Sequence, residues 1–367
     1  MALSTVIRSG PPVLKKYRYK LLLAIAIAWT IIDGTYMTIK YYIIGAENDN
    51  HFFEYREWRT LILREVLVFI TSCLIGYLLV FRQQRMHKSV PLWVNFALNT
   101  IILLVISFVF NLLFHFCYSV FISKLSVSSA FNEFIHDAFY TYWLLQKIPH
   151  WLLIFLVTML VMELAEKYSP GVFRDILLGK YLQPRIEKRI VMFMDLKDST
   201  PIAEKLGTKE YFRFIRDFIY LVSIAMIEYN GRIYQYVGDE VVVSWMFSTT
   251  NVRKCRDTLI EARRLLQRNS NRFRRSYGVV PEFRVGIHVG DVTVGEIGVI
   301  KKDIAMSGDT MNTTARIRTA CSELNQKFIV SKAFADLMDL KEWQLEDLGL
   351  VDLKGKKEGI ELVALKI

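Results

Sequence analysis

The chain has 367 residues, of which 47 are Lys or Arg and 36 are Asp or Glu, so its formal net charge is +11. Its mean hydropathy is +0.26 although 23% of its residues are charged, a composition that excludes a disordered chain, a collagen-like repeat and a small disulfide scaffold. Apolar residues concentrate in residues 19–165, whereas residues 166–367 resemble an ordinary soluble domain. The sequence therefore predicts a membrane-embedded half followed by a soluble domain.

Four long apolar segments are predicted to cross a membrane, because a spanning helix needs about 20 mainly apolar residues. They cover residues 19–44, 60–81, 92–121 and 148–165. Residues 1–18 are predicted to form a cytoplasmic tail, and residues 122–147 a loop. We expect an all-α transmembrane bundle of about four helices over residues 19–167.

The basic residues predict how this bundle is oriented. They cluster before the first span (Arg8, Lys15, Lys16, Arg18 and Lys20) and between the second and third (Arg82, Arg85 and Lys88). Because short loops rich in Lys and Arg stay in the cytoplasm, the N-terminus, the 82–91 loop and the soluble domain are predicted to be cytoplasmic. We expect a multi-pass protein of the plasma (inner) membrane.

The ionisable residues inside the predicted spans include Asp33 and His115, whereas Arg64 and Glu65 lie near the start of the second span, at its expected interface. An ionisable group inside a membrane is costly and often functional, so Asp33 and His115 are each a candidate for sensing an unknown membrane ligand. The alternative is a hydrogen bond between neighbouring helices. For His115, which has no spaced partner, we favour that alternative.

Residues 168–188 connect the two halves. The Ser-Pro-Gly sequence at 169–171 ends the last span, and Phe173, Ile176 and Leu177 recur at helical spacing. We expect a linker with a short helix, which either transmits a movement to the soluble domain or only tethers it.

From residue 189 onward, strand and helix patterns alternate. The sequence predicts a buried strand over 189–195, a helix over 208–229, a hairpin over 231–247 with its turn at 237–240, a basic helix over 251–277, paired strands over 283–290 and 292–298, a helix from residue 309 and terminal strands. Because helices alternate with hairpins, we predict an α+β domain rather than a parallel doubly wound sheet.

Two aspartates are predicted to meet at one edge of this sheet. Asp195 ends the first strand and Asp239 lies in the hairpin turn. Either alone is most simply a turn or cap residue. If the hairpin pairs beside the first strand, however, the two carboxylates converge and can hold two Mg²⁺ ions, as nucleotidyl transfer requires.

The turn between these aspartates leads into a helix N-terminus, where free N–H groups suit phosphate binding. Its residues are Leu196, Lys197, Asp198, Ser199 and Thr200. The sequence therefore places a candidate triphosphate site next to the candidate metal site.

Four motifs in the soluble half are similar to those of one enzyme family: FMDLKDST, YQYVGDEVVVSW, FRVGIHVGDVTVGEIG and SGDTMNTTARI. On these motifs, residues 189–367 resemble the catalytic domain of class III nucleotidyl cyclases. The resemblance implies a ferredoxin-like α+β fold, a head-to-tail homodimer and two Mg²⁺ (or Mn²⁺) ions per active site. It also implies conversion of a nucleoside triphosphate to a 3′,5′-cyclic nucleotide and pyrophosphate.

The resemblance assigns roles to individual residues. Asp195 and Asp239 match the family's metal-binding aspartates, Asn312 its ribose-positioning asparagine and Arg316 its transition-state arginine. Lys354 matches the triphosphate lysine, with two further lysines within three residues. Asn312 and Arg316 are four residues apart and so share one helix face, which independently supports joint action.

The residues that select the base depart from the family's patterns. Gln235 stands where adenylyl cyclases usually carry Lys, and Ala305 where they usually carry Asp or Thr, with Asp303 two residues away as a substitute. Neither matches the Glu/Cys pair of guanylyl cyclases. We favour ATP on family frequency; an amide such as Gln235 can also bond guanine or a pyrimidine, so a cyclase for another base is the alternative.

Three other function classes fit the sequence less well. A diguanylate cyclase is disfavoured because the Gly-Asp-Glu at 238–240 lacks the preceding Gly and the following Phe. A non-catalytic nucleotide receptor would be expected to lack a metal aspartate or the arginine. Nucleic-acid binding is disfavoured because the positive charge follows the membrane topology.

Overall fold

The computed structural model describes residues 12–39, 58–86, 91–121, 126–140, 143–167, 172–300, 302–338, 344–353, 356 and 358–366. The chain forms two compact units. One is Lys15–Lys167, and the other contains Tyr168–Ile367.

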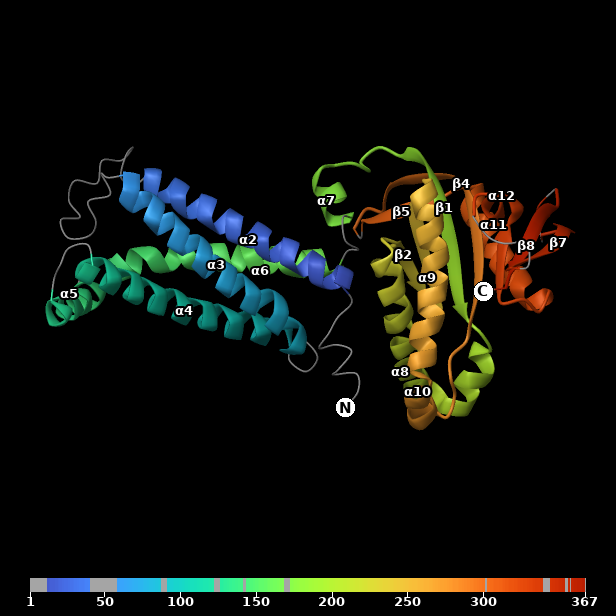
Figure 1. Cartoon of the computed structure of the whole chain (residues 1–367), viewed down its shortest axis with the longest axis horizontal. Helices are drawn as coiled ribbons and strands as arrows, with labels where there is room; N and C mark the ends of the chain where they lie inside the picture. The colour runs from blue at the N-terminus through green and yellow to red at the C-terminus, as the bar shows by residue number, and fades with distance from the viewer. Residues whose placement is uncertain are drawn as a thin grey trace. The chain divides into compact units, whose positions relative to one another are not determined.

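The N-terminal unit is helical. Its helices are α2 (Pro12–Thr38), α3 (Trp58–Met86), α4 (Leu92–Phe121), α5 (Val127–Tyr140) and α6 (Trp143–Lys167). Within this unit the four longer helices run lengthwise beside one another, with the short α5 at one end (Figure 1). The segment 122–147, predicted to be a loop, thus contains α5, whose Ala130 is fully buried.

The long helices carry apolar side chains on their outer faces as well as inside. Trp29 and Phe155 pack in the interior, while Ile31, Leu74 and Leu153 are exposed. Two stretches are long and apolar enough to cross a membrane, Lys15–Thr38 and Arg64–Phe81, and Phe96–Leu112 and Ile148–Leu164 are shorter apolar stretches. Two candidate spans are therefore found in the described residues, and the four-span bundle stays a prediction.

The C-terminal unit is built on a mixed sheet of eight strands. They are β1 (Arg185–Leu196), β2 (Arg232–Val237), β3 (Glu240–Met246), β4 (Phe283–Ile297), β5 (Asp303–Ser307), β6 (Phe328–Ser331), β7 (Leu345–Val351) and β8 (Ile360–Leu365). The order is β2-β3-β1-β4-β6-β8-β7, with β5 paired to β4. Among the described strands only β4 and β6 pair in parallel, which confirms the prediction of an α+β domain.

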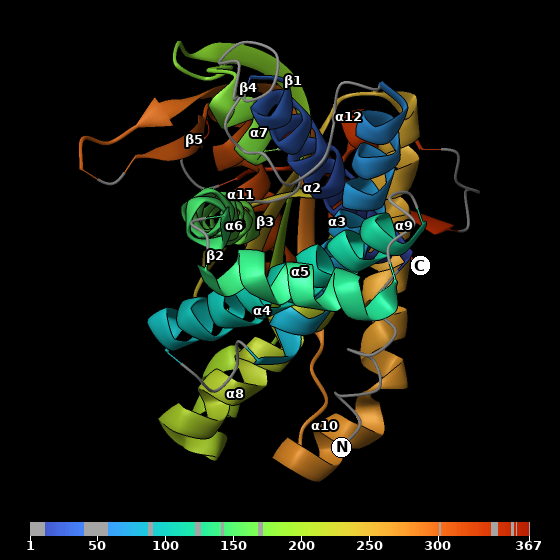
Figure 2. The same cartoon turned by 90° about the vertical axis from the view of Figure 1, so that its left-hand side faces the viewer.

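Helices cover both faces of this sheet. They are α7 (Val172–Leu177), α8 (Ser199–Glu228), α9 (Thr249–Arg268), α10 (Ser270–Tyr277), α11 (Asp309–Glu323) and α12 (Lys332–Ala335). Even-numbered β1 residues such as Met192 pack with Phe218 of α8 and Leu259 of α9. On the other face, Ile317 of α11 packs against Ile329 of β6. Figure 2 shows α10 directly below α9, with α8 on the other side of the view.

Two predicted elements are corrected by the structure. Residues 283–297 form one continuous strand, β4, instead of a hairpin, because β4 pairs with β1 from Phe283 to Val294 without a turn. The basic helix predicted over 251–277 is interrupted at Asn269, whose side-chain amide donates to the carbonyl of Leu265 and so ends α9.

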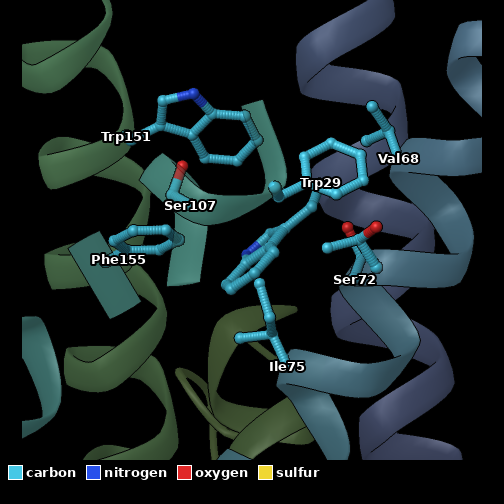
Figure 3. A pocket seen from close by; sticks show the side chains of 9 residues that line it. Trp29, Val68, Ser72, Ile75, Ser107, Trp151 and Phe155 are labelled. Carbon is cyan, nitrogen blue, oxygen red and sulfur yellow. The ribbon is translucent and has the colours of Figure 1, made fainter. Parts of the chain in front are cut away.

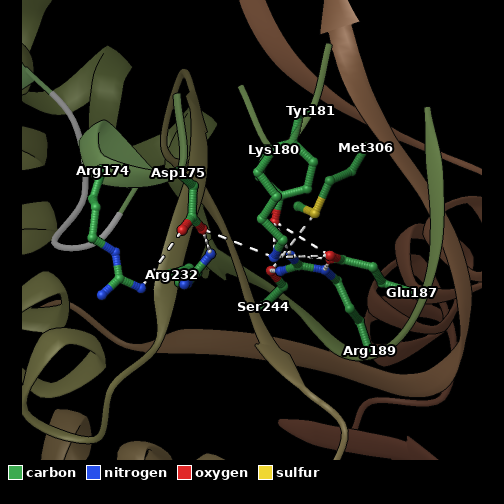
Figure 4. A network of polar contacts seen from close by, with 9 residues as sticks. All are labelled: Arg174, Asp175, Lys180, Tyr181, Glu187, Arg189, Arg232, Ser244 and Met306. Atoms are coloured by element: carbon green, nitrogen blue, oxygen red, sulfur yellow. Dashed lines mark hydrogen bonds and ion pairs between the residues drawn. The ribbon is translucent and has the colours of Figure 1, made fainter. Parts of the chain in front are cut away.

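The linker is tied to the sheet by buried charges (Figure 4). Asp175 of α7, 5% exposed, accepts a 2.8 Å hydrogen bond from Arg232 of β2. Beyond α7, Lys180 pairs with Glu187 at 3.1 Å, and the buried Arg189 donates to Ser244 of β3 at 2.9 Å. The linker is therefore anchored to β1 and β2, and Arg189 joins β1 to β3.

Candidate active site

The structure brings the two predicted metal-binding aspartates together. β3 pairs antiparallel with β1 so that Asp195 lies opposite Glu240, and Asp239 precedes Glu240 in a turn that Gly238 forms with φ of +62°, a conformation that favours glycine. Burial raises the pKa of Asp195; the charge of Arg318 lowers it and that of Asp239 raises it.

The donor groups of this cluster fit a hard divalent cation. Asp239 Oδ2 is buried and has no hydrogen-bond partner among the described residues, so a buried lone pair is left for a ligand. No group of three or more His, Cys, Asp or Glu in the described part of the chain is arranged to hold a metal. Two carboxylates suffice for Mg²⁺, which usually keeps several waters and binds substrate phosphates as well.

Two charged residues that sequence reasoning missed complete the cluster. Arg318 Nε lies 2.7 Å from Glu240 Oε2, and Arg318 Nη1 lies 3.5 Å from Asp195 Oδ2. Burial raises the pKa of Glu240, against the lowering effect of Arg318. Glu240 could have been found from its place directly after Asp239, whereas nothing in the sequence around Arg318 indicates this contact.

The turn from Leu196 to Thr200 connects β1 to α8, as predicted. The Leu196 side chain lies in the core, and its N–H bonds the Asp195 carboxylate. Lys197 is held by Glu282 at 3.3 Å. Asp198 caps α8 in a left-handed conformation without a side-chain hydrogen bond to the helix. The groups of this turn that can bind a phosphate are therefore the backbone N–H groups at the start of α8.

Ser199 and Thr200 form the first turn of α8, where N–H groups have no partner within the helix. The Ser199 hydroxyl bonds Tyr211, a residue that sequence reasoning missed. Burial and the charge of Asp239 raise the pKa of Tyr211, so its phenol stays protonated. A hydroxyl donor thus lies beside the carboxylates.

Asn312 and Arg316 both lie on α11, as predicted. Among the described residues neither side chain has a hydrogen-bond or ion-pair partner. The arginines whose charges act on Asp195 are Arg318 and Arg284, not Arg316. Because successive residues advance about 100° around a helix, Arg316 and Arg318 point to different sides of α11. One chain therefore does not bring Arg316 to its own aspartates.

The predicted base-selecting residues lie on β2 and β5. A bulge between Ile233 and Gln235 places the exposed Gln235 opposite Val242. Ala305 of β5 lies opposite Gly295 of β4. The Asp303 carboxylate accepts a hydrogen bond from the backbone N–H of Ile304. The two strands meet where Met306 N–H donates to the Tyr234 hydroxyl at 3.1 Å, one residue away from Gln235 and from Ala305. Sequence reasoning missed Tyr234.

Residues 182–366 match the sequence model of the adenylate and guanylate cyclase catalytic domain. The chain belongs to this family. Adenylate cyclase 2 of Rhizobium meliloti (strain 1021) is 30% identical over 210 residues, which cover 56% of this chain and 57% of that protein. Adenylate cyclase 1 of the same organism is 28% identical over 179 residues, 47% of this chain and 26% of that protein. The chain thus spans about half or less of the length of these relatives.

The fold of the cyclase domain agrees with this assignment. A bacterial light-regulated adenylyl cyclase of known structure aligns with a TM-score of 0.52 and 19% identity, over 59% of this chain and 64% of that chain. The predicted resemblance to class III cyclases is confirmed, and so is the predicted fold of the C-terminal domain.

The lysine predicted to bind the triphosphate of the cyclase domain, Lys354, lies outside the described residues. Its neighbour Lys356 pairs with Asp309 in the first turn of α11, Nζ to Oδ2 at 2.7 Å. This contact lowers the pKa of Asp309. Lys356 is therefore already paired with a carboxylate.

The residues predicted to sense a membrane ligand lie on α2 and α4. Asp33 is buried, and both of its carboxylate oxygens accept hydrogen bonds from Arg64 of α3. It therefore bonds a neighbouring helix, as the alternative interpretation predicts. The side chain of His115 lies outside the described residues. A cavity of 10 Å³ beside Trp29 and Ser107 (Figure 3) has room for about one water, not for a larger ligand.

Proposed function

We propose that the chain is a membrane-bound nucleotidyl cyclase, which converts a nucleoside triphosphate, with ATP favoured, to a 3′,5′-cyclic nucleotide and pyrophosphate. The observation that carries the proposal is the convergence of Asp195 and Asp239 beside the free N-terminus of α8, in a domain of the cyclase family. The buried and unpartnered Asp239 oxygen supports a cation there.

In the proposed reaction the ribose 3′-oxygen bonds the α-phosphorus, the bond from that phosphorus to pyrophosphate breaks, and the 3′-hydroxyl proton passes to solvent. Two Mg²⁺ (or Mn²⁺) ions held by Asp195 and Asp239 would lower the pKa of the 3′-hydroxyl and neutralise the triphosphate. The N–H groups at the start of α8 are placed to bind phosphate oxygens. Arg316 stabilises negative charge in the transition state, and Asn312 orients the ribose.

We further propose that two chains share each active site. Asn312 and Arg316 have no side-chain partners among the described residues, and Arg316 does not act on Asp195 of its own chain. In a homodimer with two-fold symmetry, each chain can supply its aspartates to one site and its Asn312 and Arg316 to the other.

ATP is the proposed substrate because the two Rhizobium relatives are named adenylate cyclases. Gln235 is exposed on β2, and its amide can pair with adenine as both donor and acceptor. The same amide can pair with guanine or a pyrimidine, and Ala305 adds no polar group. A cyclase for another base is therefore the second candidate.

Membrane attachment is proposed through α2, α3, α4 and α6. At about 1.5 Å per residue, α4 with 30 residues and α6 with 25 residues are long enough for a hydrocarbon core of about 30 Å. Their exposed Ile101 and Leu153 suit contact with lipid. The positive-inside rule then puts the cyclase domain in the cytoplasm.

The test uses the purified full-length chain in detergent with Mn²⁺ and each of ATP, GTP, CTP and UTP, followed by mass spectrometry of the products. We expect 3′,5′-cyclic AMP and pyrophosphate. Asp195→Ala should abolish product, while the control Asp336→Ala, at an exposed residue paired with Lys332, should not. Metal-dependent product from Asp195→Ala, or no product from any nucleotide, would contradict the proposal.

A further inference from the structure

Arg318 holds two of the three carboxylates at the candidate metal site. Its guanidinium lies between Asp195, at 3.5 Å from Nη1, and Glu240, at 2.7 Å from Nε. Arg318 Nε and Glu240 Oε2 are both buried, and neither has a hydrogen-bond partner among the described residues. The contact is therefore an ion pair without hydrogen-bond geometry. Asp239 Oδ2, the third carboxylate's inner oxygen, has no such partner.

The position of Arg318 is set by its backbone. A Cβ on Gly286 of β4 would lie 2.4 Å from Arg318 N and 2.8 Å from Arg318 Cα, so α11 touches the sheet at this residue only because glycine lies beneath it. Gly286 pairs with Phe193, two residues before Asp195. This close approach brings the guanidinium within reach of the end of β1.

An arginine and a divalent cation compete for the same carboxylate, since both need its negative charge. We propose that Arg318 is an internal counter-ion, which pairs with Asp195 in the metal-free protein and moves to Glu240 alone when a cation binds Asp195 and Asp239. The inference rests on the proposed function of the same site. Arg318 acts through Asp195 and is a positioning residue, not a catalytic one.

Glu240 remains as an ion-pair partner for the displaced guanidinium of Arg318. It is the closer of the two partners, and it follows the turn residue Asp239 on β3, so the shift requires only a side-chain movement. A buried arginine left without any carboxylate would be costly. The arrangement lets the cation enter without that cost.

The test measures Mn²⁺ binding to the full-length chain in detergent without nucleotide, from the electron paramagnetic resonance signal of free Mn²⁺, and thermal unfolding in chelator. Arg318→Gln should tighten Mn²⁺ binding about fivefold to tenfold, since an adjacent opposite charge changes the affinity of a carboxylate for a proton by about a factor of ten or more. It should also lower the Tm in chelator. The control Arg284→Gln removes a charge that acts on Asp195 but pairs with Asp198, and should change the affinity about twofold at most.

Unchanged or weaker Mn²⁺ binding by a folded Arg318→Gln chain would overturn the inference, and a fall in Tm alone would make Arg318 an ordinary structural residue. If that variant does not fold, Glu240→Gln replaces it. We then expect weaker Mn²⁺ binding, and unchanged binding overturns the inference. If the wild type makes cyclic nucleotide but Arg318→Gln binds Mn²⁺ with unchanged affinity, the inference fails and the proposed function stands. A wild type that neither binds Mn²⁺ nor makes product overturns both.

Discussion

Replacing Gly286 by Ala tests how closely α11 must approach β4. The new Cβ would lie 2.4 Å from Arg318 N and 2.8 Å from the carbonyl oxygen of Thr314. Both are backbone atoms of the helix and cannot rotate away. An ordinary contact therefore requires α11 to move by about 1 Å, together with Asn312 and Arg316.

Overpacking of this kind costs about 1–3 kcal/mol. For a domain of this size each kcal/mol lowers the Tm by about 2–4 °C, so we expect a fall of about 2–12 °C. Because a displacement of about 1 Å at catalytic groups can cost about 100-fold in rate, cyclase activity should fall far more than stability does.

The assay compares thermal unfolding and cyclase activity of full-length Gly286→Ala with the wild type, with activity measured well below the Tm. Gly295→Ala in the same strand is the control, since its Cβ would lie 3.2 Å from the nearest atom, Pro184 Cα. Its effect should be smaller. A Gly286→Ala chain with wild-type Tm and activity would refute the reasoning.

Two further predictions concern buried titratable groups. Asp239→Asn should abolish metal-dependent activity while leaving the metal-free Tm unchanged or higher, because it removes a buried charge whose oxygen has no partner among the described residues; a large fall in the metal-free Tm would contradict this. Burial and the charge of Lys356 lower the pKa of His288 to about 4, below its unfolded value of about 6.5. Since the unfolded chain then binds more protons, stability should fall by roughly 3 kcal/mol as the pH drops from about 6.5 to 4. Denaturant titrations should show that the stability of His288→Gln depends less on pH than that of the wild type. An equal pH dependence would show that His288 is not its cause.

The part of the site that could be predicted from sequence rests on local signals. Asp195 ends an apolar run and Asp239 lies in a hairpin turn, so pairing of the two neighbouring strands is enough to bring them together. Asn312 and Arg316 follow from helical spacing. Each of these positions depends on the residues beside it in the chain.

The contacts that could not be predicted depend on distant parts of the chain. Arg318 reaches Asp195 only because Gly286, 32 residues earlier in the sequence, leaves no side chain beneath α11. The prediction divided residues 283–298 into two strands after Gly290, but this glycine lies within β4 and leaves room for Thr310, whose hydroxyl would lie 2.5 Å from a Cβ there. A glycine indicates missing volume without indicating which distant segment fills it.

The central claim, that two chains share each active site, is tested most directly by co-expressing full-length Asp239→Ala and Arg316→Ala. Each variant alone should be inactive. In mixed dimers one site has both residues intact, so random pairing should restore about a quarter of the wild-type activity. No restored activity, in co-purified mixed dimers that are folded, would contradict the shared site.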